Sequence, residues 1–178
     1  MTSGSLVVDD VLPVYHHRRV HEIGCACSPE GALAALRRCD LASSRVIRVL
    51  FTLRGLPRRD LTIEGLERIG FRVLGIREGR EMALGLIGRF WRPGGGLVDF
   101  AAGEFAGFEE PGFVKVVDSY QASPSPSGST LRCETRIRCT SSDSRRAFGR
   151  YWAVVAPFSG LVRRRWLLLA RRAAESRR

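Results

Sequence analysis

Hydrophobic and polar positions alternate most regularly between residues 131 and 140. Leu131, Cys133, Thr135, Ile137 and Cys139 alternate with Arg132, Glu134, Arg136, Arg138 and Thr140. A period of two is typical of a strand in a sheet that has one buried face and one solvated face. The pattern therefore predicts a strand whose arginines and glutamate point to water.

From residue 141 the apolar positions follow at steps of three and four. They form one stripe: Phe148, Trp152, Val155, Ser159, Val162, Trp166, Leu169 and Ala173. This period predicts a long amphipathic helix over residues 141–174, with Thr140 and Asp143 as its capping pair. Pro157 removes a backbone donor inside that helix, so a kink or bulge is expected there.

The remaining segments predict several shorter elements. Strands are expected at 14–25, 71–77, 80–91, 97–100 and 113–122, helices at 29–38, 44–55 and 63–69, a helical turn at Phe105 and Phe108, and a hairpin loop at 123–129. No strand–helix–strand alternation occurs, which favours an antiparallel sheet and an α+β fold. Residues 1–13 are expected to be a flexible leader, and residues 14–178 a single domain.

The charge of +11 is spread along the chain, and of the 29 basic residues only Lys115 is lysine. Because the arginines form no single patch, no nucleic-acid partner is expected. The five cysteines are odd in number and irregularly spaced, which favours reduced thiols. No charged region precedes an apolar run near the N-terminus, and the uncharged stretch 151–162 is too short to span a bilayer, so the expected location is the cytoplasm.

The order of elements resembles the START-like or SRPBCC superfamily, which includes the Bet v 1-like and polyketide cyclase/dehydratase-like proteins. The resemblance lies in residues 15–21 leading into Ser28-Pro29-Glu30, and in residues 135–150 leading into the long helix. Residues 85–93 are similar to a segment of uncharacterised bacterial members. The resemblance implies a helix-grip fold, in which a curved antiparallel sheet wraps around the C-terminal helix and leaves a cavity. It also implies a lipid- or polyketide-like ligand.

A set of apolar side chains lies at strand ends, in the loop after them and on the helix stripe. The candidate ligand-binding residues are Trp91, Phe105, Phe108, Phe113, Tyr120, Phe148, Trp152, Val155 and Ser159. Pockets for apolar or amphipathic small molecules are lined in this way. The alternative is that the rings only fill the core, and the resemblance favours the pocket. The leading hypothesis is a binding protein without enzymatic activity.

Asp118 is the candidate catalytic residue of an alternative, enzymatic hypothesis. It shares one face of its strand with Val114, Val116 and Tyr120. If that face points inward, an apolar environment would raise the pKa of its carboxyl and make it a general acid or base. The enzyme would then be a cyclase- or dehydratase-like lyase or isomerase. Phe113 and Val117 on the opposite face leave the inward side undecided.

Neither a metal nor a cofactor is expected. On an extended strand His17 and His21 lie ~13 Å apart, too far for one zinc ion, although His16, Cys25 and Cys27 are nearby. A third hypothesis is an interaction protein whose arginine-rich surface binds an acidic partner or an anionic membrane, for example through the basic tail 163–178. We favour a tail that docks on the sheet by its apolar stripe. The sequence leaves the oligomeric state open.

Overall fold

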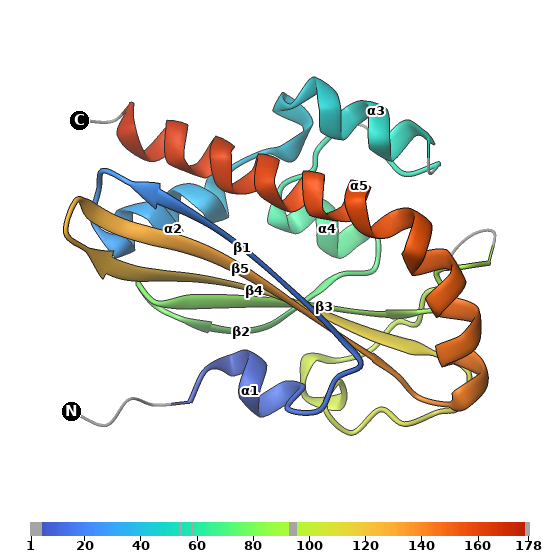
Figure 1. The fold of residues 1–178 in the computed structure, drawn as a ribbon. Coiled ribbons are helices and arrows are strands. Elements are labelled where there is room, and N and C mark those ends of the chain that lie inside the picture. Colours follow the sequence, from blue (N-terminus) through green and yellow to red (C-terminus); the bar gives the residue numbers. More distant parts are fainter. Residues whose placement is uncertain (1–4, 54, 58, 93–95, 177–178) are drawn as a thin grey trace.

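The computed structural model describes residues 5–53, 55–57, 59–92 and 96–176 of the chain. Five antiparallel strands form one sheet in the order β1-β5-β4-β3-β2, and a long C-terminal helix packs on one face (Figure 1). The strands are β1 His17–Cys25, β2 Arg72–Arg77, β3 Glu81–Gly88, β4 Val114–Ser125 and β5 Gly128–Cys139. The helices are α1 Val7–Val11, α2 Pro29–Arg38, α3 Arg45–Leu53, α4 Ile63–Arg68 and α5 Ser142–Glu175. The predicted α+β class with a helix-grip arrangement is confirmed.

The capping chemistry explains where the main helices begin. Ser28 accepts a hydrogen bond from the Gly31 amide, and Pro29 occupies the first helical position of α2. At the start of α5 the cap is Ser141, which exchanges hydrogen bonds with Ser144. The predicted capping pair of Thr140 and Asp143 is therefore wrong, because the Thr140 hydroxyl bonds to the backbone of Phe113 instead.

α5 runs without interruption through Pro157, and Figure 1 shows its axis turning in the first half of the helix. The hairpin between β4 and β5 is tighter than predicted, because pairing continues to Ser125 and Gly128 inside the Ser/Pro/Gly segment. The predicted strand at 97–100 does not form in the structure. One backbone bond, from the Val98 amide to the Ile87 carbonyl, ties that segment to β3.

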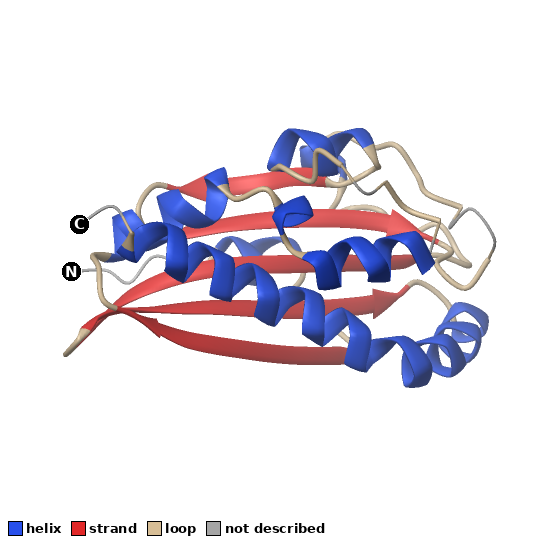
Figure 2. Cartoon of the chain, turned by 90° about the horizontal axis from the view of Figure 1, so that it is seen from above, coloured by secondary structure: helices blue, strands red, loops and turns tan. Residues whose placement is uncertain are grey.

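The helices divide between the two faces of the sheet. α2, α3, α4 and α5 lie over one face (Figure 2), and α1 lies against the other. On the α5 face, Leu36 of α2 and Trp166 of α5 pack in one buried cluster with Met82 and Tyr120 of the sheet. On the α1 face, Val8 and Leu12 pack against Val117. The sheet is therefore covered by apolar contacts on both sides.

The predicted flexible leader is wrong for residues 6–12; residues 1–4 lie outside the described part of the chain. The amides of Val7 and Val8 donate hydrogen bonds to the buried carboxylate of Glu81, over 2.6 and 3.3 Å. Val8 and Leu12 are 0% and 1% exposed. A carboxylate at the N-terminus of a helix satisfies amides that have no partner within the helix, so α1 is anchored by charge as well as by packing.

Candidate functional site

The candidate site is the contact between the middle of α5 and the sheet. α5 is tightly packed at two places, at Phe148 and again from Trp166 to Ala170. Every residue of α5 between Phe148 and Trp166 keeps some solvent exposure, including Val155 and Ser159 of the predicted inner stripe. The helix is thus held firmly on both sides of a looser central stretch.

An ion pair crosses this central stretch from β4 to α5. Arg163 Nε lies 2.7 Å from Asp118 Oδ1, and Nη2 lies 2.9 Å from Oδ2. The Thr135 hydroxyl donates to Asp118 Oδ1 over 2.6 Å, and Arg163 Nη1 donates to the carbonyl and hydroxyl of Ser159. The two paired side chains are only 11% and 10% exposed. Burial opposes the charge of Arg163, but Asp118 outweighs burial and raises the pKa of the guanidinium.

These contacts answer the question that the sequence left open about Asp118. Its face of β4 does point toward α5, together with Tyr120. The environment differs from the apolar one that was predicted, because a bidentate arginine faces the carboxyl group. Both carboxylate oxygens are occupied by protein donors. The geometry gives Asp118 a structural partner, and proton transfer by Asp118 stays an untested prediction.

Tyr120 and Cys133 lie beside the ion pair on the same face of the sheet. The Tyr120 ring packs on Trp166 with 4.5 Å between the ring centroids. Burial raises the pKa of the Tyr120 phenol well above its usual value, and burial, with the charge of Asp118 added, raises the pKa of the Cys133 thiol to about 12. Both groups are therefore neutral near neutral pH, and Cys133 lacks the thiolate that a nucleophile needs.

His21 contacts α5 from β1. Its Nδ1 accepts a hydrogen bond from Arg164 Nε over 3.3 Å, and its buried Nε2 has no partner among the described residues. A Cβ added at Gly160 would stand 3.2 Å from that Nε2, so the helix backbone approaches the imidazole closely. Burial, followed by the charges of Arg164 and Arg163, lowers the pKa of His21. The imidazole is therefore neutral near pH 7.

An aromatic cluster closes the end of the site at the start of α5. Phe148 lies at its centre, stacked on Trp152 at 5.5 Å and edge-on to Trp91 at 6.4 Å between ring centroids. His17 approaches Phe148 to 5.9 Å. Trp152 Nε1 is buried without a hydrogen-bond partner in the described part of the chain. This end of the site is therefore mainly aromatic, with the His17 imidazole and the Trp152 indole as its polar groups.

The structure brings together only part of the predicted ligand-binding set. Trp91, Phe148 and Trp152 form the aromatic cluster, Val155 and Ser159 lie on the central stretch of α5, and Tyr120 packs at the far end beside Trp166. Phe105, Phe108 and Phe113 pack with α1 on the opposite face of the sheet. Their assignment to a common pocket with Phe148 is wrong, because Phe113, directly before β4, packs with Val117 on the face opposite Tyr120, and Phe105 and Phe108 pack beside it.

Arg163, Thr135 and His21 are the polar residues of the site that the sequence analysis did not select. Arg163 lies four residues after Ser159, a spacing that places both on one side of a helix. That spacing was the available signal for Arg163. Thr135 and His21 fall on strand positions whose neighbours across the sheet depend on register, which the sequence does not give.

Two further predictions concern thiols and the basic tail. All five cysteines are free, and Cys25 and Cys27 have their sulfur atoms 3.2 Å apart. The described residues hold no group of three or more metal-ligating side chains. Trp166 of the predicted stripe is buried together with Leu167 and Ala170, and Val162 and Leu169 pack against the same cluster, so this part of the tail packs on the protein. Among the described helices, none has the length and apolar character to cross a bilayer.

Comparisons with known proteins leave the family open. No family model matches the chain, and no curated protein matches it. Among solved structures, the crystal structure of protein MLL2253 from Mesorhizobium loti aligns over 90% of this chain and 98% of its own, with 15% sequence identity and a TM-score of 0.42. A likeness at this level carries no argument about function. The function must therefore be argued from the site itself.

Proposed function

We propose that this chain binds an amphipathic small molecule, lipid- or polyketide-like, along the inner side of α5 between Phe148 and Arg163, and that it does so without catalysis. One observation carries the proposal. Residues that face the sheet in this stretch stay half-buried, although the helix is tightly packed at both ends of it. Such a stretch has unused apolar surface that a ligand would bury.

The two ends of the stretch differ in polarity in a way that fits an amphipathic ligand. The aromatic cluster of Trp91, Phe148 and Trp152 offers apolar contact at one end. At the other end, the Ser159 hydroxyl accepts from Arg163 Nη1 and can still donate to a polar group of the ligand. The buried Trp152 Nε1 lacks an acceptor in the described residues, and an oxygen of the ligand would satisfy it. Beyond Arg163 the interface is filled by Tyr120 and Trp166, so the ligand would end there.

The cyclase or dehydratase alternative receives less support from the site. Such an enzyme needs a carboxyl or another titratable group that exchanges a proton with its substrate. Both oxygens of Asp118 are held by Arg163 and Thr135, and Cys133 and Tyr120 are held neutral by burial. The site therefore offers contact surface and orientation more readily than proton transfer. Membership of the START-like superfamily is likewise a proposal, and the observed fold class is compatible with it.

Two measurements test the binding proposal. Native mass spectrometry of the protein purified from its own host should show a co-purifying small molecule. Dansyl-labelled undecanoic acid should bind saturably to the emptied protein, and Val155→Phe should weaken that binding about tenfold, because the larger side chain fills the inner stretch.

Val154→Phe is the matched control, because Val154 is the adjacent residue on α5 and is 67% exposed. It should leave the affinity unchanged. A protein that purifies without a bound molecule and shows no saturable binding of the dansyl probe would refute the proposal. Equal losses in the two variants would also refute it, since the effect would then not come from the inner side of the helix.

A further inference from the structure

α3 has apolar side chains on two sides. One side packs on the protein core, and the other is exposed to solvent. Ile47 is fully buried and Phe51 packs against the core beneath the helix. Val49 and Leu53, four residues apart on the outer side, are 58% and 78% exposed. Because residues at this spacing lie on one side of a helix, they form a continuous apolar strip that faces solvent.

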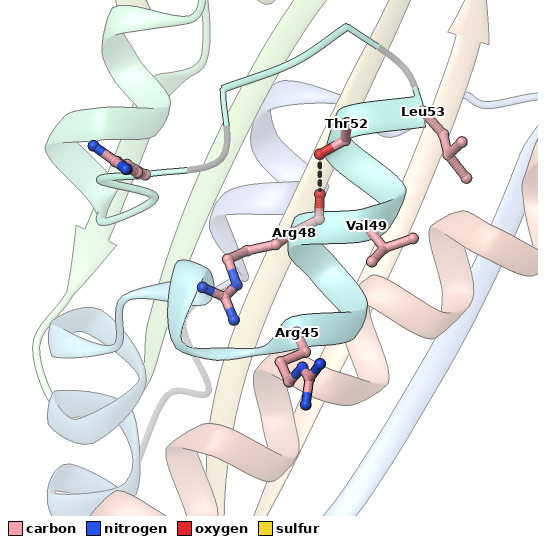
Figure 3. A pocket seen from close by; sticks show the side chains of 6 residues that line it. Arg45, Arg48, Val49, Thr52 and Leu53 are labelled. Atoms are coloured by element: carbon pink, nitrogen blue, oxygen red, sulfur yellow. Dashed lines mark hydrogen bonds between the residues drawn. The ribbon is translucent and has the colours of Figure 1, made fainter.

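The strip borders an open hollow on the surface of the protein (Figure 3). The hollow measures about 490 Å³ and is lined by Arg45, Arg48, Val49, Thr52, Leu53 and Arg59. A second hollow of about 260 Å³ lies along the same helix, against Arg45, Val46, Val49 and Leu50. Apolar and cationic groups are thus interleaved on one face, which we call the α3 surface.

The side chains that line the α3 surface carry charge of a single sign, and the flanking Asp40 and Asp60 are bonded within the protein. Residues 41–59 contain five arginines and no aspartate or glutamate. Within the described residues, Arg45, Arg48 and Arg59 form no ion pair, whereas the nearby Arg68 is paired with Asp60. The α3 surface therefore carries positive charge that the protein itself does not neutralise.

We propose that the α3 surface binds an anionic lipid bilayer. The arginines would contact the phosphates and acidic headgroups, and Val49 and Leu53 would enter the boundary between headgroups and acyl chains. Basic amphipathic helices lie in membrane interfaces in this way, and each arginine near an anionic surface contributes about 1 kcal/mol. This inference places the membrane contact on α3 and leaves the basic tail docked on the protein. It does not depend on the proposed ligand.

Vesicle sedimentation with the full chain tests the proposal. Phosphatidylcholine vesicles that contain phosphatidylserine should retain the protein, vesicles of phosphatidylcholine alone should retain much less, and added salt should weaken the binding. Arg45→Gln combined with Arg48→Gln should lower the partition coefficient about thirtyfold, because each lost arginine costs a factor of about five. Leu53→Ser should lower it about tenfold through lost apolar contact.

Matched controls separate the α3 surface from the charge of the whole protein. Arg146→Gln with Arg150→Gln removes the same charge from exposed positions on the first turns of α5, and Val14→Ser removes an apolar side chain that is 62% exposed elsewhere. Both should bind vesicles within about twofold of the unchanged protein. Equal losses in the controls and in the α3 variants would overturn the proposal. The absence of binding to anionic vesicles would also overturn it. Two further results would do the same: self-association of the protein that Leu53→Ser abolishes, or tighter binding to nucleic acid than to the vesicles.

Discussion

The two faces of the sheet bury charge in different ways. On the α5 face, one arginine and one aspartate cross an otherwise largely apolar contact. On the α1 face, the carboxylate of Glu134 accepts hydrogen bonds from three arginines, and one of them, Arg136, also binds Asp9 of the N-terminal segment. The first face relies on a single pair, and the second on a network whose outer members still reach water.

The network on the α1 face corrects the expectation that this side of β5 is solvated. Glu134 is 2% and Arg136 8% exposed. Arg136 Nη1 donates to the carbonyls of Val8 and Leu12, over 3.3 and 3.2 Å, so α1 covers the charges and is hydrogen-bonded by them. The alternation along β5 gave the correct two faces, but a polar face can be buried when its charges are paired.

The same face also buries a lysine, whose shortest polar contact is a backbone carbonyl and whose carboxylate partner lies farther away. Lys115 is fully buried, and its Nζ donates to the Ala106 carbonyl over 2.8 Å, with Glu109 3.9 Å away. Burial lowers the pKa of Lys115, and Glu109 opposes that shift. Within the described residues, paired or hydrogen-bonded charges recur on this face, whereas the contact between α5 and the sheet has one buried pair. Removing one partner should therefore cost more on the α5 face than on the α1 face.

Asp118→Ala should produce the largest loss, about 3–5 kcal/mol in the free energy of unfolding, because Arg163 would be left buried without its counter-charge. Denaturant unfolding followed by circular dichroism measures this. Asp118→Leu combined with Arg163→Met should recover most of the loss, since a buried pair replaced by apolar groups is often neutral. A loss below about 1 kcal/mol for Asp118→Ala would show that the pair is effectively solvated.

The sequence predicts long periodic elements and local caps well, and it predicts a short helix held by distant residues poorly. Periodicity located α5 and β5 closely because each has a long amphipathic pattern. It placed Ser28 and Pro29 at the start of α2 because caps are local. The short helix α1 was missed, since a five-residue segment has too few turns to show a period and its partner Glu81 lies 74 residues away.

The candidate site was predicted only in part for a related reason. Phe148 and Trp152 were found because they share one helix stripe. Arg163 was not selected from the sequence, because arginines usually lie in water and only the position of Asp118 across the interface places this one at the buried contact. Contacts between strands and helices depend on register and packing, which no local pattern along the chain contains.

Leu12→Ala tests whether α1 is part of the folded domain. Leu12 is 1% exposed, and truncating a buried leucine should lower the free energy of unfolding by about 3 kcal/mol. Val14→Ala, two residues further and 62% exposed, should change it by less than about 0.5 kcal/mol. Equal, small effects of the two changes would mean that residues 6–12 are not packed on the sheet in solution.

The smallest of these effects is the dependence of stability on pH that Glu134 should produce. Burial acts to raise the pKa of Glu134, but hydrogen bonds from Arg18, Arg132 and Arg136 outweigh it and lower the pKa from 4.5 to about 2. A carboxyl with a lower pKa in the folded state stabilises the protein above its unfolded pKa, and this contribution is lost as the pH falls toward the folded pKa. Between about pH 6 and pH 3 the loss should be about 2 kcal/mol.

Glu134→Gln should remove this component, so the stabilities of the variant and the unchanged protein should converge as the pH is lowered. Glu22→Gln is the control, because Glu22 binds Arg132 from the exposed rim of the same network, with 49% of its side chain accessible. It should keep the pH dependence, since exposed pairs contribute little. Parallel pH curves for Glu134→Gln and the unchanged protein would show that the arginines of the α1 face do not hold this carboxyl charged.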